Sequence, residues 1–282
     1  MKLTKVIISL LALLSIAMFV GCNNQNQTQN DSGLEGKITM SGSTTVLPIA
    51  QACAEEFMNQ NPRVNISVRG GGSSIGIKDI MAGTVEIGNA SRDAKGKEIN
   101  KAKESGIDLY QNVVANDGIA IIVNPKNTIT NLTLEQIQAI YTGKYTNWKE
   151  LGGPDMNIVL ISRDTSSGTY EVFYEIAMKK QNIVQNCVMV ASNNAAVTSV
   201  KDTPGAISYA GLGYLSSSVK PIQVNGVDPT MANVLSGKYA VARKLNMYTN
   251  GAPKGITKAF MDFVLSAEGQ KIVEKQGFIK VQ

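Results

Sequence analysis

Four times along the chain, a short apolar segment of strand character runs into a turn rich in glycine and hydroxyl side chains, and a helical pattern follows. The four strand segments are residues 37–40, 64–68, 85–88 and 158–161. Strands that alternate with helices predict an α/β fold with mostly parallel sheets. Ligands of open α/β sheets bind at the carboxyl ends of the strands, so we expect the four turns to contribute to one site.

The fourth turn, residues 162–170, reads Ser-Arg-Asp-Thr-Ser-Ser-Gly-Thr-Tyr. It leads into residues 171–180, where apolar residues recur at helical spacing. The start of a helix has unpaired backbone N–H groups and the positive end of the helix dipole, which suits an oxyanion. Arg163 adds a planar fork for two oxygens. Serine and threonine are also common helix caps, so a cap without a ligand is the alternative for this turn taken alone.

The composition narrows the possible functions. The chain has 282 residues, no histidine and a formal charge of +5. Two of these charges, Lys2 and Lys5, lie in an N-terminal leader, so the remainder carries only +3, which does not favour a nucleic-acid partner. The absence of histidine removes Ser-His-Asp and Cys-His catalysis and the commonest zinc ligand.

Other kinds of site fit these turns less well. Residues 70–74, Gly-Gly-Gly-Ser-Ser, lack the Lys-Ser/Thr end of a Walker A loop, and a plain flexible loop is the alternative. A hydrolase would need a base beside Ser73 or Ser167, where only carboxylates and lysines are available. Acidic residues are scattered, which disfavours a metal site. We therefore expect no catalytic residue, metal or cofactor; the neutral donors suit a small, desolvated tetrahedral oxyanion.

The N-terminus has the pattern of an export signal. Residues 1–5 are basic, residues 6–20 are apolar but short for a membrane span, and Phe-Val-Gly-Cys follows at 19–22. We expect a signal peptide over 1–21, a lipidated Cys22 that resembles a lipobox cysteine, and a flexible tether over 22–36. An uncleaved anchor is the alternative. Both place the protein outside the cytoplasm, on the outer face of the cell membrane.

Three further local patterns carry structural expectations. Thr133 and Gln136 have the spacing of a capping box, which predicts a helix over 133–141. Residues 255–275 read as two joined helices. The two remaining cysteines, Cys53 and Cys187, are expected to be buried thiols.

In order along the chain, seven motifs resemble the phosphate-binding proteins of ATP-driven phosphate importers. The resemblance covers the chain from Lys37 to its end. The motifs are residues 42–48, 70–74, 87–92, 141–148, 163–169, 204–209 and 266–270. Each is weak alone, but the order is specific.

The resemblance implies a two-lobed periplasmic-binding-protein fold of type II, with two crossover strands and a ligand cleft between the lobes. Lobe 1 would comprise residues 37–121 and 243–282, and lobe 2 residues 122–242. The crossovers are expected near 120–123 and 241–244.

The resemblance also implies a phosphate site that closing of the lobes completes. Thr44 would donate its hydroxyl and Thr45 its backbone N–H. The other implied ligands are Ser73 and Ser91 from lobe 1, with Arg92 as a second positive charge, and Arg163, Ser167, Gly168 and Thr169 from lobe 2.

One position departs from the family pattern. Members of the family use an aspartate after the fourth strand to accept the proton of hydrogen phosphate, which excludes sulfate. Here the segment reads Ala-Ser-Arg-Asp, so Asp93 is the candidate acceptor. Asp164 is a candidate charge partner for Arg163.

The sequence therefore predicts a monomeric, lipid-anchored phosphate-binding protein that delivers its ligand to an ABC permease with a cytoplasmic ATPase. A binding protein for sulfate or molybdate is the alternative in the same class. A surface phosphate-ester hydrolase is the alternative from another class.

Overall fold

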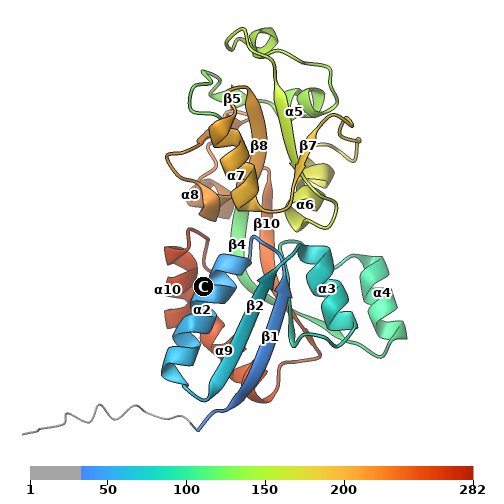
Figure 1. Ribbon diagram of the computed structural model, residues 1–282, viewed down its shortest axis with the longest axis vertical. Coiled ribbons are helices and arrows are strands. Elements are labelled where there is room, and N and C mark those ends of the chain that lie inside the picture. Colours follow the sequence, from blue (N-terminus) through green and yellow to red (C-terminus); the bar gives the residue numbers. More distant parts are fainter. Residues whose placement is uncertain (1–32, 282) are drawn as a thin grey trace, which may run out of the picture. The chain divides into compact units, whose positions relative to one another are not determined.

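The computed structural model describes residues 33–281, whose elements pack around two large hydrophobic cores and a small cluster of Ile77, Ala90 and Tyr248 (Figure 1). The first core contains Phe57 and Phe260, and the elements around it form lobe 1. The second core contains Phe173 and Tyr209, and the elements around it form lobe 2. The predicted signal peptide and Cys22 lie outside the described residues. No helix within 33–281 has the length and apolar character needed to cross a membrane.

Lobe 1 is built on a sheet with the strand order β2, β1, β3, β10, β4. The strands are β1 (Gly36–Gly42), β2 (Val64–Gly70), β3 (Ile87–Ala90), β4 (Leu109–Val123) and β10 (Ala242–Asn250). The first three strands are parallel, and β10 lies antiparallel between β3 and β4. The carboxyl ends of β1, β2 and β3 therefore lie at one edge of the sheet.

Helices cover both faces of this sheet. They are α2 (Leu47–Gln60), α3 (Ser73–Met81), α4 (Gly96–Glu104), α9 (Gly255–Leu265) and α10 (Ala267–Lys275). The first core lies between the sheet and α2, α9 and α10, where Phe57 contacts the rings of Phe260 and Phe263. Figure 1 shows α3 and α4 on the other side of the sheet.

Lobe 2 repeats this layered arrangement around the second half of β4. Its other strands are β5 (Asn131–Leu132), β6 (Val159–Arg163), β7 (Val188–Val190), β8 (Ala206–Gly211) and β9 (Lys220–Val224). Its helices are α5 (Leu134–Tyr141), α6 (Gly168–Ile176), α7 (Asn193–Asp202) and α8 (Met231–Leu235), with short 3-10 turns at Trp148–Leu151 and Leu212–Tyr214. Parallel pairing of β6 with β7 and β8 places their carboxyl ends side by side.

A stacked aromatic pair fixes the end of β6. The ring of Phe173 in α6 lies 3.9 Å from that of Tyr209 in β8, measured between centroids. The Tyr209 hydroxyl lies 2.7 Å from the Ser162 hydroxyl and accepts a hydrogen bond from the Arg163 N–H. Packing in the second core thus sets the position of Arg163.

Strand β4 belongs to both lobes. Its first part pairs with β10, and from Ile119 onward it pairs with β8 and β9. Val114 and Ala115 lie in the first core, whereas residues 119–123 lie in the second. The chain passes between the two cores at this point and returns at Val241, which packs in the second core just before β10.

Most of the predicted elements are confirmed. Thr133 and Gln136 form the reciprocal capping-box bonds at the start of α5, and Ser266 separates the two joined helices α9 and α10. Cys53 and Cys187 are buried free thiols, and burial raises the pKa of each to about 12.

The helix predicted over 171–180 is wrong in its extent. It spans Gly168–Ile176, because Lys179 and Lys180 adopt left-handed backbone angles (φ 48° and 64°) that a helix cannot contain. The apolar spacing continues beyond the helix because residues 177 and 178 pack in the core as a turn.

Gly76 allows α3 to lie directly on the backbone of the lobe 1 sheet. A Cβ atom there would lie 2.6 Å from the Asn89 carbonyl oxygen and 2.8 Å from that of Ser41. These atoms belong to β3 and β1 and cannot move independently of the sheet. The close approach holds Ser73, the first residue of α3, beside the ends of those strands.

We expect Gly76→Ala to lower the free energy of unfolding by about 1–3 kcal/mol, because overpacking outweighs the gain of about 1 kcal/mol in helix propensity. Urea unfolding measures this. Gly96→Ala is the matched control, because a Cβ atom on Gly96, in helix α4, meets nothing within 4 Å. An equal change in both variants would contradict the packing argument.

Candidate functional site

The turn after β1 presents two buried threonines. The Ser43 hydroxyl accepts the N–H of Thr45 at 3.1 Å and so caps the turn. This bond occupies the N–H that was predicted as an anion donor. The side chains of Thr44 and Thr45 are buried and, as described below, meet residues of lobe 2.

The turns after β2 and β3 meet each other. Ser73 begins α3, and its hydroxyl accepts the Ser91 N–H at 2.9 Å. The two hydroxyl oxygens lie 3.4 Å apart. Both residues are buried, so the carboxyl ends of three parallel strands contribute hydroxyls to one place.

In lobe 2, the turn between β6 and α6 has the predicted strand-to-helix form. Ser167 caps α6 by accepting the Tyr170 N–H at 3.2 Å, and Ser167, Gly168 and Thr169 are buried. The Asp164 carboxylate accepts the Ser166 N–H at 2.9 Å. It caps the turn, and no hydrogen bond or ion pair joins it to Arg163 among the described residues.

The turns of the two lobes are in direct contact. The hydroxyl oxygens of Thr45 and Thr169 lie 3.1 Å apart, and Arg163 Nη2 donates to the Thr44 hydroxyl at 3.2 Å. A Cβ atom on Gly168 would lie 2.2 Å from the Ser73 hydroxyl oxygen. We call the buried hydroxyls that meet here the hydroxyl cluster: Thr44, Thr45, Ser73, Ser91 and Thr169.

Two residues that the sequence analysis missed hold this cluster. The first is Asn193, at the start of α7. Its amide nitrogen donates to the Thr44 hydroxyl at 3.3 Å and the Thr45 hydroxyl at 3.0 Å, and its oxygen accepts the Gly211 N–H at 3.3 Å. Asn193 follows strand β7, so it occupies a fifth turn of the same type; the polar Ser-Asn-Asn sequence there is the signal that could have revealed it.

The second is Arg243, in β10. Its guanidinium donates to the hydroxyls of Thr169 (2.8 Å), Ser91 (3.3 Å) and Thr45 (3.3 Å), and so contacts both lobes. Asp117 in β4 accepts from Arg243 Nε at 2.9 Å and from Nη2 at 2.7 Å. A charged residue between the apolar segments 113–115 and 119–123 was the available signal, since buried carboxylates need partners.

The Arg243–Asp117 pair is ionised despite its burial. Burial raises the pKa of Asp117 while the Arg243 charge and hydrogen bonds oppose this, and burial lowers the pKa of Arg243. Arginine stays protonated in proteins, and its charge then favours the carboxylate. The pair therefore adds no net charge to the cluster.

Arg163 is buried and forms no ion pair, although the charge of Asp164 acts on it at longer range. It is 1% exposed, and its Nε and Nη2 donate to the backbone carbonyls of Val190 and Ala191. Its Nη1 is buried and has no hydrogen-bond partner, and no carboxylate within 33–281 forms an ion pair with it. Burial lowers the pKa of Arg163, yet a guanidinium remains charged. Arg163 therefore brings to the site a positive charge that no ion pair neutralises.

The cluster also has more donors than acceptors. The Thr44 oxygen accepts from Arg163 and Asn193, which fills both lone pairs and leaves its O–H free to donate. Thr45 accepts from Asn193 and Arg243 and so donates to Thr169. Thr169, which also accepts from Arg243, keeps a spare hydrogen. Amide and guanidinium groups thus turn the hydroxyls into donors, which is the pattern an oxyanion needs.

Arg92 and Asp93 lie differently from the other predicted residues. Arg92 forms a two-pronged ion pair with Glu98, 2.8 Å at each oxygen, and donates to the Ser74 hydroxyl. Burial opposes ionisation of Glu98, but the Arg92 bonds hold its pKa below the usual value. Asp93 is exposed and accepts from Gln111 at 2.7 Å. Neither side chain is hydrogen-bonded to the hydroxyl cluster.

The chain is similar to known proteins. Residues 25–268 match the family model described as a PBP superfamily domain. The chain is 34% identical to the phosphate-binding protein PstS of Bacillus subtilis, over 100% of this chain and 95% of the relative. It is 33% identical to PstS of Borreliella burgdorferi, over 99% of both.

A solved structure has a similar fold. It is a crystal structure from Clostridium perfringens, described as a phosphate ABC transporter substrate-binding protein with bound phosphate. Its TM-score is 0.82 at 42% identity, over 88% of this chain and 100% of that one. The chain therefore belongs to the PBP superfamily and, within it, to the family of the PstS phosphate-binding proteins.

Proposed function

We propose that the protein binds inorganic phosphate at the hydroxyl cluster and delivers it to an ABC-type import permease. The observation that carries this proposal is the buried, unpaired Nη1 of Arg163 beside hydroxyls whose lone pairs are already filled. Such a site offers positive charge and hydrogen-bond donors but few acceptors. The relatives named PstS and the phosphate-bound Clostridium perfringens structure support the choice of phosphate among oxyanions.

In this proposal, an oxyanion replaces the mutual hydrogen bonds of the cluster. Thr44, Thr45, Ser73 and Ser91 donate from lobe 1. Arg163, the α6 turn (Ser167, Gly168 and Thr169), Asn193 and Arg243 complete the shell. Because Thr45 and Thr169 come from different lobes, the full set of donors exists only when the lobes are closed, and ligand binding favours closure.

We further propose how the protein is anchored, what its oligomeric state is and where its lobes begin and end. The protein is a solute-binding protein without catalytic activity, held by lipidated Cys22 on the outer face of the membrane as a monomer. Lobe 1 comprises residues 37–121 and 243–282, and lobe 2 comprises 122–242. The switch of β4 pairing at Ile119 and the position of Val241 support bounds near these.

Isothermal titration with phosphate, sulfate and molybdate tests the function. We expect phosphate to bind most tightly, and tighter binding of sulfate or molybdate would overturn the assignment.

Arg163→Ala should weaken phosphate binding at least about tenfold, because a charge-assisted hydrogen bond contributes about 1.5–3 kcal/mol and 1.4 kcal/mol is tenfold. Arg69→Ala, which removes an exposed arginine, is the control. An unchanged dissociation constant for Arg163→Ala would remove Arg163 from the site.

Gly168→Ala tests whether closure is needed. The new Cβ atom would meet the hydroxyl oxygens of Ser73 and Ser91, 2.2 and 2.7 Å away in the closed protein. We expect at least about a tenfold loss of phosphate affinity, since 1.4 kcal/mol of overpacking is enough for that. Gly96→Ala is again the matched control, because both glycines are the first residue of a helix. Unaltered affinity of Gly168→Ala would show that binding does not require the closed contact.

A third pair of variants tests the discrimination against sulfate. Asp93 was the acceptor predicted from sequence, but its carboxylate is exposed and bonded to Gln111. Asp117 contacts the cluster through Arg243, so we propose it as the acidic group that sets selectivity. We expect Asp93→Asn to leave the ratio of phosphate to sulfate affinity unchanged and Asp117→Asn to lower it, both measured by titration. A lower ratio in Asp93→Asn would restore Asp93 to this role.

A further inference from the structure

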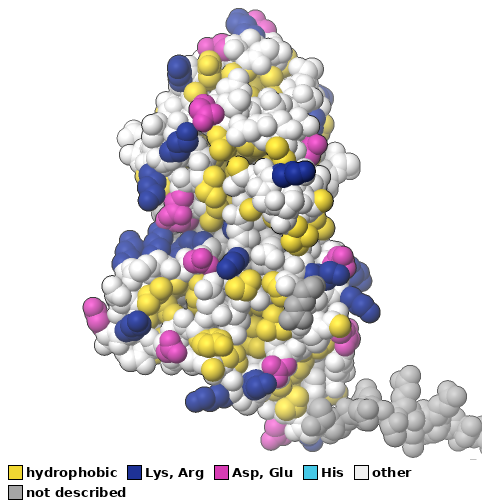
Figure 2. Space-filling view, turned by 180° about the vertical axis from the view of Figure 1, so that it is seen from behind, with side chains coloured by type: hydrophobic (Ala, Val, Ile, Leu, Met, Phe, Trp, Pro, Cys, Tyr) yellow, Lys and Arg dark blue, Asp and Glu magenta, His cyan; other side chains and the backbone are white. Residues whose placement is uncertain are grey.

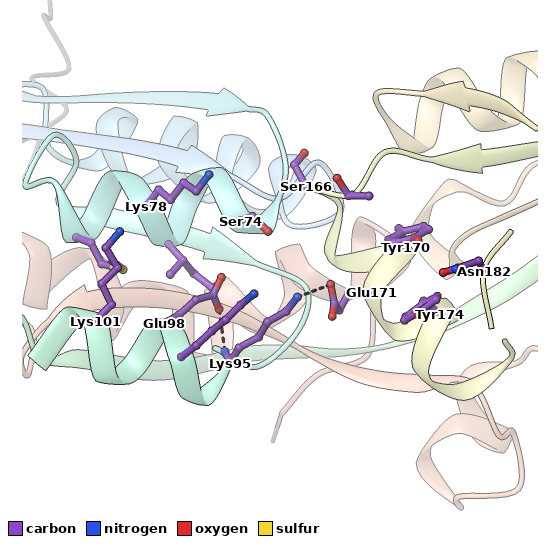
Figure 3. Close-up of a pocket in the computed structure, with 14 residues that line it drawn as sticks. Ser74, Lys78, Lys95, Glu98, Lys101, Ser166, Tyr170, Glu171, Tyr174 and Asn182 are labelled. Carbon is purple, nitrogen blue, oxygen red and sulfur yellow. Dashed lines mark hydrogen bonds and ion pairs between the residues drawn. The ribbon is translucent and has the colours of Figure 1, made fainter. Parts of the chain in front are cut away.

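Two cavities lie on either side of one ion pair between the lobes. Lys95 Nζ, at the start of α4, lies 2.6 Å from a carboxylate oxygen of Glu171 in α6. Both residues line a cavity of about 720 Å³, shown in Figure 3, and also a second cavity of about 340 Å³. Each cavity is a candidate path to the buried cluster.

The larger cavity lies beside the turns that carry the hydroxyl cluster. Ser74 and Ser166 line it, and their neighbours Ser73 and Ser167 belong to the predicted site. At this place the Ser74 N–H donates to the Ser166 carbonyl at 3.1 Å, and the Ser166 hydroxyl donates to the Gly71 carbonyl at 3.3 Å. Both bonds join lobe 1 to lobe 2, so separation of the lobes opens the cavity into the cluster.

The larger cavity carries an uncompensated positive charge. Three of its lysines, Lys78, Lys97 and Lys101, form no ion pair with any residue in 33–281. Its two carboxylates are already paired, Glu98 with Arg92 and Glu171 with Lys95. Figure 3 shows Lys78 and Lys101 on the helices of lobe 1 that face the cavity, opposite Tyr170 and Tyr174. In the view from behind, one group of Lys and Arg side chains lies on the left of the molecule and another on its right edge (Figure 2).

The smaller cavity has the opposite balance. Among the described residues that line it, Arg92, Lys95 and Arg243 are each paired with a carboxylate. Lys244 is then outnumbered by the carboxylates of Asp93 and Glu175, neither of which forms an ion pair. A dianion is therefore attracted to the larger cavity and not to the smaller one.

We propose that the larger cavity is the entrance for phosphate and that its three unpaired lysines accelerate capture of the anion. This inference rests on the proposed function. Charged clefts raise association rates by about 10- to 1,000-fold through their field, and the effect is screened over about 10 Å at 0.1 M salt. Since the lysines do not touch the hydroxyl cluster, they change the association rate and leave the dissociation rate unaltered.

Stopped-flow tyrosine fluorescence with inorganic phosphate measures both rates. The test variant carries Lys78→Gln, Lys97→Gln and Lys101→Gln. The control carries Lys126→Gln, Lys201→Gln and Lys238→Gln, which removes the same charge from exposed positions in lobe 2. At low ionic strength we expect the test variant to associate at least about fivefold more slowly than the control, with the difference vanishing near 1 M salt.

Three results would contradict the proposal that phosphate enters through the larger cavity. Equal association rates of the two triple variants would make the effect one of net charge, and a change confined to the dissociation rate would make the lysines ligands. Slower association of Lys244→Gln than of the triple variant would place the entrance at the smaller cavity. The proposed function fails separately: in that case the wild-type protein does not bind phosphate in equilibrium titration.

Discussion

Burying the Arg163 guanidinium costs free energy, and two backbone carbonyls and one hydroxyl do not replace a counter-charge. Its Nη1 retains donors that nothing in the described chain satisfies. The other features of the site follow from this imbalance. An oxyanion supplies the missing charge, and closing the lobes removes the water that would otherwise weaken the attraction. In the open arrangement water solvates the Arg163 guanidinium, and only in the closed arrangement does its Nη1 lack a partner. Binding and closure are therefore one event.

The hydroxyl donors decide how the anion is held. Asn193 and Arg163 fill the lone pairs of the Thr44 hydroxyl, so this hydroxyl presents its hydrogen. Asn193 and Arg243 do the same for Thr45. A guanidinium alone would attract many anions, whereas a fixed set of hydroxyl donors requires oxygens at matching positions. The Asp117 carboxylate keeps Arg243 in place and keeps the total charge low.

The sequence predicted the fold and most of the candidate site for one physical reason: each strand ends in a turn that begins a helix, and such turns meet at one edge of a parallel sheet. Thr44, Ser73 and Arg163 were accessible to this reasoning. Arg243 and Asp117 were not, because they lie within strands and their proximity depends on β10 pairing with β4 across more than a hundred residues. The sequence could not distinguish a ligand role of Arg92 from a role as ion-pair partner of Glu98, since that pairing depends on where the fold places α4.

The place of β10 in the lobe 1 sheet also governs how the chain can be assembled. Residues 242–250 lie between β3 and β4, both of which precede them by well over a hundred residues. Chains generally fold as units from the N-terminus as synthesis proceeds, but here lobe 1 has a missing central strand until nearly the whole polypeptide exists. Lobe 2 is contiguous and can form earlier. A nascent chain of this topology therefore stays open in its first half for most of its synthesis, a state compatible with export before folding.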